Sequence, residues 1–185
     1  MRMSGEYRIE APREAVWAAL NDPEVLKQAI PGCEEIEKVS DTELAAKVTI
    51  KVGPVKANFS GVVRLSDLDP PKGYTISGEG KGGPAGFAKG GAKVRLEEDG
   101  AATILHYDVE ARVGGKLAQI GSRLIDATAK KMANDFFARF AEVVGGPAPE
   151  EAAEEAAPVG AVRPLFWALG VVAIVLVLLA IFGLN

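Results

Sequence analysis

The sequence is short of the residues that most enzymes use for chemistry. It has one histidine, His106, and one cysteine, Cys33, among 185 residues. A single cysteine excludes a disulfide within the chain, which fits a reducing compartment. A zinc site would need two carboxylate ligands beside these residues, and no spacing in the sequence provides them. We therefore expect no metal site.

Neither residue is a good catalytic candidate. His106 alternates with the apolar residues of a predicted strand, so it belongs to the polar face. Cys33 follows a Pro-Gly turn and precedes Glu34 and Glu35. Nearby carboxylates raise the pKa of a thiol and weaken it as a nucleophile. We expect no catalytic residue and no enzymatic activity.

The sequence also has no basic block and no apolar stretch near its N-terminus. All but one of the 21 Lys and Arg, and all but four of the 25 Asp and Glu, lie in residues 1–144. This nearly neutral balance excludes nucleic acid as an expected partner. The first ten residues have scattered charges where a signal peptide would have an apolar core. We therefore expect the N-terminal domain to face the cytoplasm.

A long apolar run is present at residues 165–184, which contain no charged residue. Twenty helical residues span about 30 Å, the thickness of the hydrocarbon core of a bilayer. Arg163 precedes the run, and Phe166 and Trp167 stand where an interfacial aromatic belt would lie. A buried core helix would not be apolar on every face. The sequence predicts a single-pass C-terminal transmembrane helix in the cell membrane.

Residues 145–164 are dominated by Pro, Ala and Glu. This composition predicts a linker that is mobile or transiently helical. Such a chain averages roughly 25 Å from end to end and reaches about 65–70 Å at full stretch. The sequence therefore divides into a domain at 1–144, a linker at 145–164 and a membrane span at 165–184.

The domain has a recognisable order of elements. Residues 3–12 predict a strand, and two short helices follow at 12–22 and 23–30, each with an early proline. Residues 33–113 alternate with a period of two, which predicts an antiparallel meander of about six strands with one dry face. Residues 116–144 return to helical spacing, with an apolar stripe formed by Leu117, Ile120, Leu124, Thr128, Met132, Phe136, Phe140 and Val143. This order predicts an α+β helix-grip fold, a curved antiparallel sheet wrapped around a long C-terminal helix.

Many positions on the predicted dry face have short side chains. Ile76 is followed on its face by Gly78 and Gly80, and the strand of Val94 contributes Gly90 and other short residues. These glycines either let the sheet curve and the helix approach closely, or they leave an apolar pocket between the two. The candidate pocket residues are Phe59, Gly61, Ile76, Gly78, Gly80, Gly90, Ala92, Tyr107, Leu124, Thr128, Met132 and Phe136.

Seven glycines fall between Gly78 and Gly91. A phosphate-binding loop needs a following helix N-terminus and usually a lysine at a fixed position. This stretch lies between two predicted strands and contains no GKS or GKT. We therefore do not expect nucleotide binding.

Several segments resemble the CoxG family, named for the G subunit of carbon monoxide dehydrogenase. The resemblance begins with APREAVWAALNDPEVLKQAIPGCEEIEKV at 11–39, where Pro-Gly-Cys at 31–33 is the most specific feature. The later segments at 48–71 and 78–96, and KKMANDFFARF at 130–140, are similar to the rest of the family pattern. The resemblance covers about residues 1–144.

This resemblance implies a START-like helix-grip fold of the SRPBCC superfamily, whose members hold apolar ligands between sheet and helix. It also implies an accessory role beside a molybdenum-containing hydroxylase of the CO dehydrogenase type. The electrons of such an enzyme must reach a quinone in lipid. The implied partners are this dehydrogenase, membrane lipid and a respiratory quinone, menaquinone or ubiquinone, with no cofactor of the protein's own.

Three functions fit these observations. The first is a quinone-binding adaptor that recruits the hydroxylase to the membrane. The second is a bare membrane anchor whose core is packed shut. The third is a START-like enzyme or lipid carrier, which would be marked by polar titratable residues inside the pocket.

Overall fold

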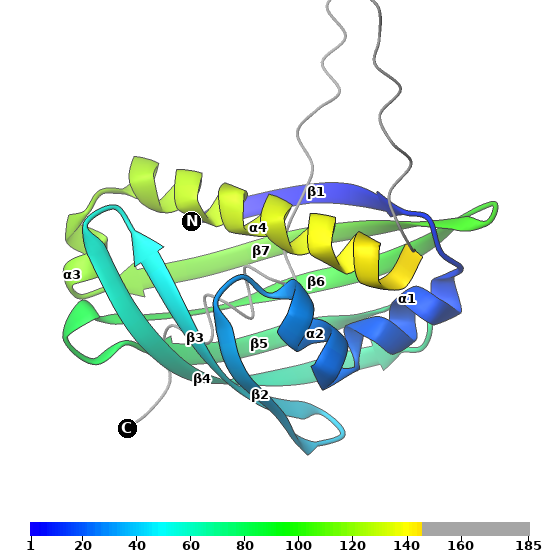
Figure 1. Ribbon diagram of the computed structural model, residues 1–185, viewed down its shortest axis with the longest axis horizontal. Helices are drawn as coiled ribbons and strands as arrows, with labels where there is room; N and C mark the ends of the chain where they lie inside the picture. The colour runs from blue at the N-terminus through cyan, green and yellow to red at the C-terminus, as the bar shows by residue number, and fades with distance from the viewer. Residues whose placement is uncertain (146–185) are drawn as a thin grey trace, which may run out of the picture.

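The computed structural model describes residues 1–145, which form one antiparallel sheet with helices against one face (Figure 1). The sheet has seven strands in the order β1-β7-β6-β5-β4-β3-β2. The strands are β1 (Arg2–Ile9), β2 (Cys33–Ser40), β3 (Glu43–Val52), β4 (Val55–Asp69), β5 (Gly73–Lys81), β6 (Phe87–Asp99) and β7 (Ala102–Gly114). The six strands from β2 to β7 confirm the predicted meander.

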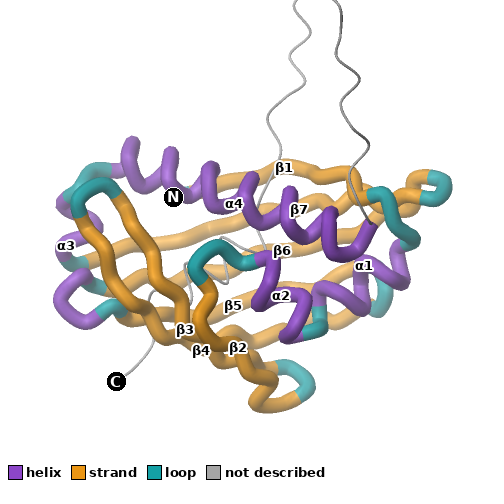
Figure 2. Tube along the Cα trace, viewed as in Figure 1, coloured by secondary structure: helices purple, strands orange, loops and turns teal. Residues whose placement is uncertain are grey.

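The helices gather on one side of the strands (Figure 2). They are α1 (Arg13–Leu20), α2 (Pro23–Ala29), η1 (Gly83–Ala85), α3 (Lys116–Gln119) and α4 (Ser122–Gly145). Helix α2 begins where the sequence predicts, because the side chain of Asp22 accepts a hydrogen bond from the backbone N–H of Glu24 at 2.8 Å. Pro23 occupies the first helical turn, where its missing N–H is not needed.

Helix α4 contacts strands near both edges of the sheet. It packs against α2 and approaches β1 near one sheet edge and β3 near the other. A sheet whose two sides reach the same helix must be strongly curved. The structure therefore confirms the α+β helix-grip architecture.

The inner face of the sheet is apolar, as the alternation predicts. Leu44, Val48 and Ile50 of β3 are each at most 5% exposed, and Lys47 between them is exposed. The same alternation continues through β4 to β7. Among residues 1–145, the fully buried polar residue is Thr103, whose hydroxyl donates to the carbonyl of Ala11 at 2.7 Å.

The prediction of one helix across 116–144 is wrong. The structure has a short α3 and a separate α4, joined through Gly121 with a φ of +97°. Gly115, just before α3, also has a positive φ of +74°. Both glycines adopt the left-handed region that interrupts a right-handed helix. The C-terminal helix therefore begins at Ser122.

The predicted linker after residue 145 and the predicted transmembrane helix at 165–184 lie outside the described residues. Within residues 1–145, no helix is both long enough and apolar enough to cross a bilayer. The membrane span remains a prediction from the sequence.

Candidate ligand-binding site

The strand register gathers the short residues of the inner face into one region. Gly78 of β5 lies opposite Gly90 of β6, and Gly90 lies opposite Ala111 of β7. Gly61 of β4 lies opposite Gly80 of β5. We call this region the short-residue band and define it as Gly61, Gly78, Gly80, Ala88, Gly90, Ala92 and Ala111.

Aromatic side chains fill the other end of the inner face. Phe137 of α4 stacks on Tyr7 of β1 with ring centroids 4.9 Å apart, and it lies 6.1 Å from the ring of Tyr107 on β7. Phe136 lies 5.0 Å from Phe137 and 5.4 Å from Phe140. The three phenylalanines are 0% exposed. We call these five residues the aromatic cluster.

Helix α4 runs from the short-residue band toward the aromatic cluster. It starts after β7 ends, and its last residue, Gly145, lies close to the carbonyl of Glu10 at the far end of the sheet. Its five buried residues all lie between Ala129 and Phe140. The first two turns therefore place no fully buried side chain over the band.

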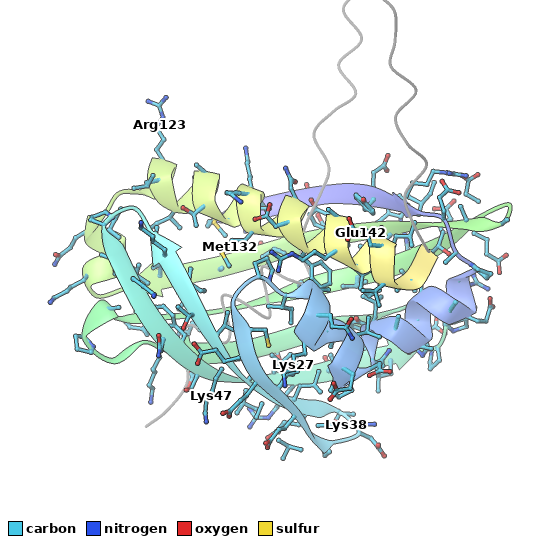
Figure 3. All side chains as sticks on the ribbon, viewed as in Figure 1. Lys27, Lys38, Lys47, Arg123, Met132 and Glu142 are labelled. Atoms are coloured by element: carbon cyan, nitrogen blue, oxygen red, sulfur yellow. The ribbon has the colours of Figure 1, made fainter. Side chains whose placement is uncertain are left out.

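The four predicted pocket residues on the helix have different environments. Phe136 is buried, and Met132 is half-buried and packs against the core (Figure 3). Thr128 is half-buried, and its hydroxyl donates to the carbonyl of Leu124 at 2.9 Å. Leu124 is 40% exposed and lies against Gly53 in the β3–β4 turn. Its side chain therefore does not reach the core, and its part in a pocket stays a prediction.

The predicted stripe agrees only in part with the buried face of α4, where Phe136 and Phe140 of the stripe are 0% exposed. Ala129, Ala133 and Phe137 are buried although the stripe omits them, and Val143 is 41% exposed although the stripe includes it. Two residues of the stripe, Leu117 and Ile120, belong to the segment before the break at Gly121. Two helices separated by a break can face the core with different sides, so apolar spacing should be counted separately in each.

The predicted pocket residues on the strands all face inward. Phe59, Ile76, Ala92 and Tyr107 are each at most 3% exposed. The Phe59 ring covers Gly82 so closely that a Cβ there would lie 1.9 Å from a ring carbon. Tyr107 and Phe136 belong to the aromatic cluster, so they lie at the filled end and not within the band.

A steric contact within the sheet explains why residue 90 is glycine. A Cβ at this position would lie 2.2 Å from the carbonyl oxygen of Glu110 on β7. The close neighbour is the backbone of β7 and not the helix, so the contact at Gly90 supports neither close approach of the helix nor, by itself, an open pocket. Gly78 and Gly90 also line a hollow of about 680 Å³ on the outer face, since glycine has no side chain to separate the two faces.

Sequence reasoning missed Tyr7 and Phe137, which hold the centre of the aromatic cluster. Tyr7 alternates with Ile9 on the first strand, so the period of two could have placed it on the inner face. Phe137 lies four residues after Ala133 and eight after Ala129, so the helical spacing of these buried residues could have placed it on the inner face.

The titratable groups near the inner face remain neutral. Burial raises the pKa of the Tyr107 and Tyr74 phenols, so both stay protonated at neutral pH. The pKa of the Cys33 thiol is raised to about 11, first by burial, while Lys27 lowers it and Glu34 raises it. The direction agrees with the prediction from the neighbouring carboxylates, but burial is the larger cause.

His106 lies on the outer face of β7, as predicted. Its Nδ1 lies 3.4 Å from a carboxylate oxygen of Glu6, and its Nε2 lies 3.2 Å from one of Glu97. It therefore faces two strand carboxylates and not the inner face. Residues 1–145 contain no group of three or more His, Cys, Asp or Glu side chains that could hold a metal ion.

Comparisons with solved structures identify the fold. The chain is similar to a conserved protein from Geobacillus kaustophilus, with 30% identity, a TM-score of 0.73, and coverage of 78% of this chain and 95% of that one. It is also similar to the protein TTHA0849 from Thermus thermophilus, with 15% identity, a TM-score of 0.60 and coverage of 78% and 97%.

A third similar structure is the Zhui aromatase/cyclase from Streptomyces sp. R1128. It has 16% identity, a TM-score of 0.55, and coverage of 78% of this chain and 93% of that one. These neighbours have the START-like fold. No curated protein sequence matches the chain.

The family profile of CoxG, the G subunit of carbon monoxide dehydrogenase, matches residues 5–145, almost the whole described domain. The match includes the Pro-Gly-Cys turn, the strands that form the short-residue band and all of α4. The chain therefore belongs to the CoxG family.

Proposed function

We propose that this protein binds a respiratory quinone, menaquinone or ubiquinone, between the short-residue band and the first turns of α4. The observation that carries the proposal is the pairing of short strand residues at the end of the sheet where α4 begins, in turns whose side chains are at most half-buried. Family membership and the START-like fold favour an apolar ligand there. Such a ligand would be held mainly by burial of its apolar surface, which contributes about 25 cal/mol per Å².

The chemistry of the inner face supports a binding role. The phenols near it stay neutral, and the buried hydroxyl of Thr103 is already bonded to Ala11. An apolar tail can therefore enter without stripping water from a charged side chain. With no titratable cluster on the inner face of the described domain, we expect no enzymatic activity of its own.

The remaining parts of the proposal place this domain in an electron-transfer assembly. The apolar segment 165–184 would hold the domain at the membrane, within reach of lipid-soluble quinone. A molybdenum hydroxylase of the CO dehydrogenase type would dock on the domain and supply the redox chemistry. Proximity to lipid together with a sheltered quinone site would then link a soluble enzyme to the respiratory chain.

The direct test is to identify what the protein carries. Full-length protein is purified in detergent, extracted with organic solvent and examined by mass spectrometry for quinone and phospholipid per protein. We expect quinone to be present and to fall at least several-fold in Ala92→Leu, whose added methyl groups enter the band. Ala45→Leu makes the same change on the outer face of β3 and should leave the quinone content unchanged.

The other outcomes separate the competing functions. Phospholipid that falls in Ala92→Leu, with no quinone, would favour a lipid carrier. If wild-type and Ala92→Leu protein carry the same molecules in the same amounts, the band holds no ligand and the bare anchor is favoured.

A cellular test separates a quinone carrier from an anchor. In a strain that lacks residues 1–144, the dehydrogenase is fused directly to residues 145–185, so that proximity is supplied without the domain. We expect substrate-dependent oxygen uptake to stay low while reduction of a soluble dye remains normal. Oxygen uptake at the wild-type level would show that anchoring alone is sufficient.

A further inference from the structure

One end of the domain is basic. Three connections meet there, with their flanking residues: 51–56 around the β3–β4 turn, 81–89 around η1, and 112–124 around α3. These ranges contain seven Lys and Arg and no Asp or Glu, the seven being Lys51, Lys56, Lys81, Lys89, Arg112, Lys116 and Arg123. We call this surface the basic end.

The three connections are neighbours in space. Helix η1 contacts both α3 and β4, and Leu124 in the first turn of α4 lies against Gly53 of the β3–β4 turn. Figure 1 shows α3, the η1 loop and the β3–β4 turn at the same end of the long axis. Arg123 projects from α4 away from the sheet (Figure 3).

The cations of the basic end are available to a partner. None of the seven forms an ion pair with a described residue. Six of them are exposed, and Lys81 is half-buried. Elsewhere in the domain, Arg2, Arg8, Arg64 and Lys47 each pair with a carboxylate. The cations of the basic end therefore have no contact ion pair within the described domain, and the nearest carboxylate in register is Glu79, opposite Lys89.

The opposite end has the reverse charge. Residues 10–14, 67–73 and 97–102 contain seven Asp and Glu and two basic residues, Arg13 and Lys72. Arg13 is bonded to Glu98 at 2.8 Å, and Arg8, just outside these ranges, pairs with Asp99 and Glu10, which still leaves more carboxylates than cations. The domain therefore has a charge asymmetry along its long axis, although its net charge is close to zero.

Exposed apolar side chains accompany the cations of the basic end. Phe87 is 47% exposed, Leu124 is 40% exposed, and Pro84 of η1 is also exposed. Cations beside an aromatic ring and a leucine are the residue types that bind anionic headgroups and enter the interface of a bilayer. An acidic protein surface is the other candidate, because protein interfaces also contain aromatic side chains and arginine, and it predicts no dependence on lipid charge.

We propose that the basic end docks on the surface of an anionic lipid bilayer and fixes the orientation of the domain there. This proposal rests on the proposed membrane attachment and adds the side of the domain that faces lipid. The short-residue band lies toward this end, because Gly80 and Ala111 are near the ends of β5 and β7. Docking would therefore hold the band close to the lipid from which an apolar ligand comes.

The length of the chain permits this orientation. Helix α4 ends at Gly145 at the acidic end, and its 24 residues span about 36 Å. Residues 145–164 would have to return over this length to bring the membrane span to the basic end. At full stretch they reach about 65–70 Å, which is enough.

The test measures which end of the full-length protein touches lipid. In a Cys33→Ser background, a fluorophore is attached through Pro84→Cys at the basic end or Lys72→Cys at the acidic end. Each protein is reconstituted into vesicles of phosphatidylcholine alone or mixed with phosphatidylglycerol, with a headgroup quencher included. We expect strong quenching at the Pro84 position only on anionic vesicles, and weak quenching at the Lys72 position on both.

Charge reversal gives the matched control. The triple variant Lys56→Glu, Lys116→Glu and Arg123→Glu should reduce the docked fraction roughly tenfold or more, because each cation near an anionic surface contributes separately. Lys72→Glu, Lys93→Glu and Arg95→Glu make the same net change at exposed sites away from the basic end and should leave it unchanged. High salt should weaken docking, since the screening length falls from about 10 Å at 0.1 M to about 3 Å at 1 M.

Equal quenching at the two labels, or quenching at Pro84 that ignores lipid charge, would overturn the proposal. The quinone content of the same samples is measured in parallel and reports on the ligand site alone. Quinone present without oriented docking would leave the proposed function standing and refute only this inference. Oriented docking without quinone would support the inference and refute the ligand.

Discussion

The two ends of the inner face use the same sheet in opposite ways. At one end, Phe136, Phe137 and Phe140 fill the space between α4 and the strands, and rings from β1 and β7 complete the packing. At the other end, β5 to β7 present glycine and alanine beside the buried ring of Phe59 on β4, and the first turns of α4 bury nothing completely. The difference separates the densely packed part of the core from the part where we propose that a ligand binds.

The largest expected effect on stability comes from removing a ring of the aromatic cluster. Phe137→Ala removes a ring that is 0% exposed and touches Tyr7, Tyr107 and Phe136. It should lower the free energy of unfolding by about 3–5 kcal/mol, measured by urea denaturation followed by circular dichroism. Leu124→Ala at the other end should lower it by less than about 1 kcal/mol, because that side chain is partly exposed. Equal losses would refute the contrast.

A second change tests why the band contains glycine. Gly90→Ala puts a Cβ against the carbonyl oxygen of Glu110, so β6 and β7 must separate locally. We expect a loss of about 1–3 kcal/mol in the free energy of unfolding, whatever the occupancy of the site. A neutral result in the same urea titration would show that Gly90 is short for the ligand and not for the backbone.

A third pair of changes compares the capacity of the two ends for added volume. Ala133→Leu inserts methyl groups beside the buried phenylalanines of α4, where Ala133 is 0% exposed. This overpacking should cost about 1–3 kcal/mol. Ala92→Leu makes the same change in the band and should cost less than about 1 kcal/mol if open space is present. Thermal melts of both variants measure the two losses of stability. Equal losses would favour a core that is fully packed at both ends.

The smallest expected effect is on the reactivity of Cys33, which reports how far water reaches this part of the sheet. Cys33 lies opposite Val48, which lies opposite Phe59. Its pKa of about 11 leaves very little thiolate at pH 8. After allowance for the greater nucleophilicity of a more basic thiolate, alkylation by iodoacetamide should be roughly tenfold slower than in urea-unfolded protein.

Burial also determines how the alkylation rate of Cys33 changes with pH. The neutral thiol is favoured in the folded protein, so the rate should continue to rise with pH up to about 11 instead of levelling near 9, the ordinary pKa. A plateau near pH 9 in the folded protein would show that water reaches Cys33 freely.

Much of the architecture could be predicted from the sequence. The period-two alternation across 33–113 gave the strands and their dry face, and the early prolines gave the two short helices. The short inward residues were also visible, because alternation alone decides which face a strand residue occupies. What failed was the single helix across 116–144, which Gly121 interrupts, and the omission of Ala129, Ala133 and Phe137 from its buried face.

The sequence by itself determined which residues are apolar, short or charged, which strand face each one occupies, and the family to which the chain belongs. These depend on local periodicity and on residue identity. Only the tertiary structure decided that Gly78 meets Gly90, that Phe137 reaches Tyr7, and that three separate connections form one basic end. Those contacts join residues far apart in the chain, and they depend on strand register and sheet curvature, which no local pattern specifies.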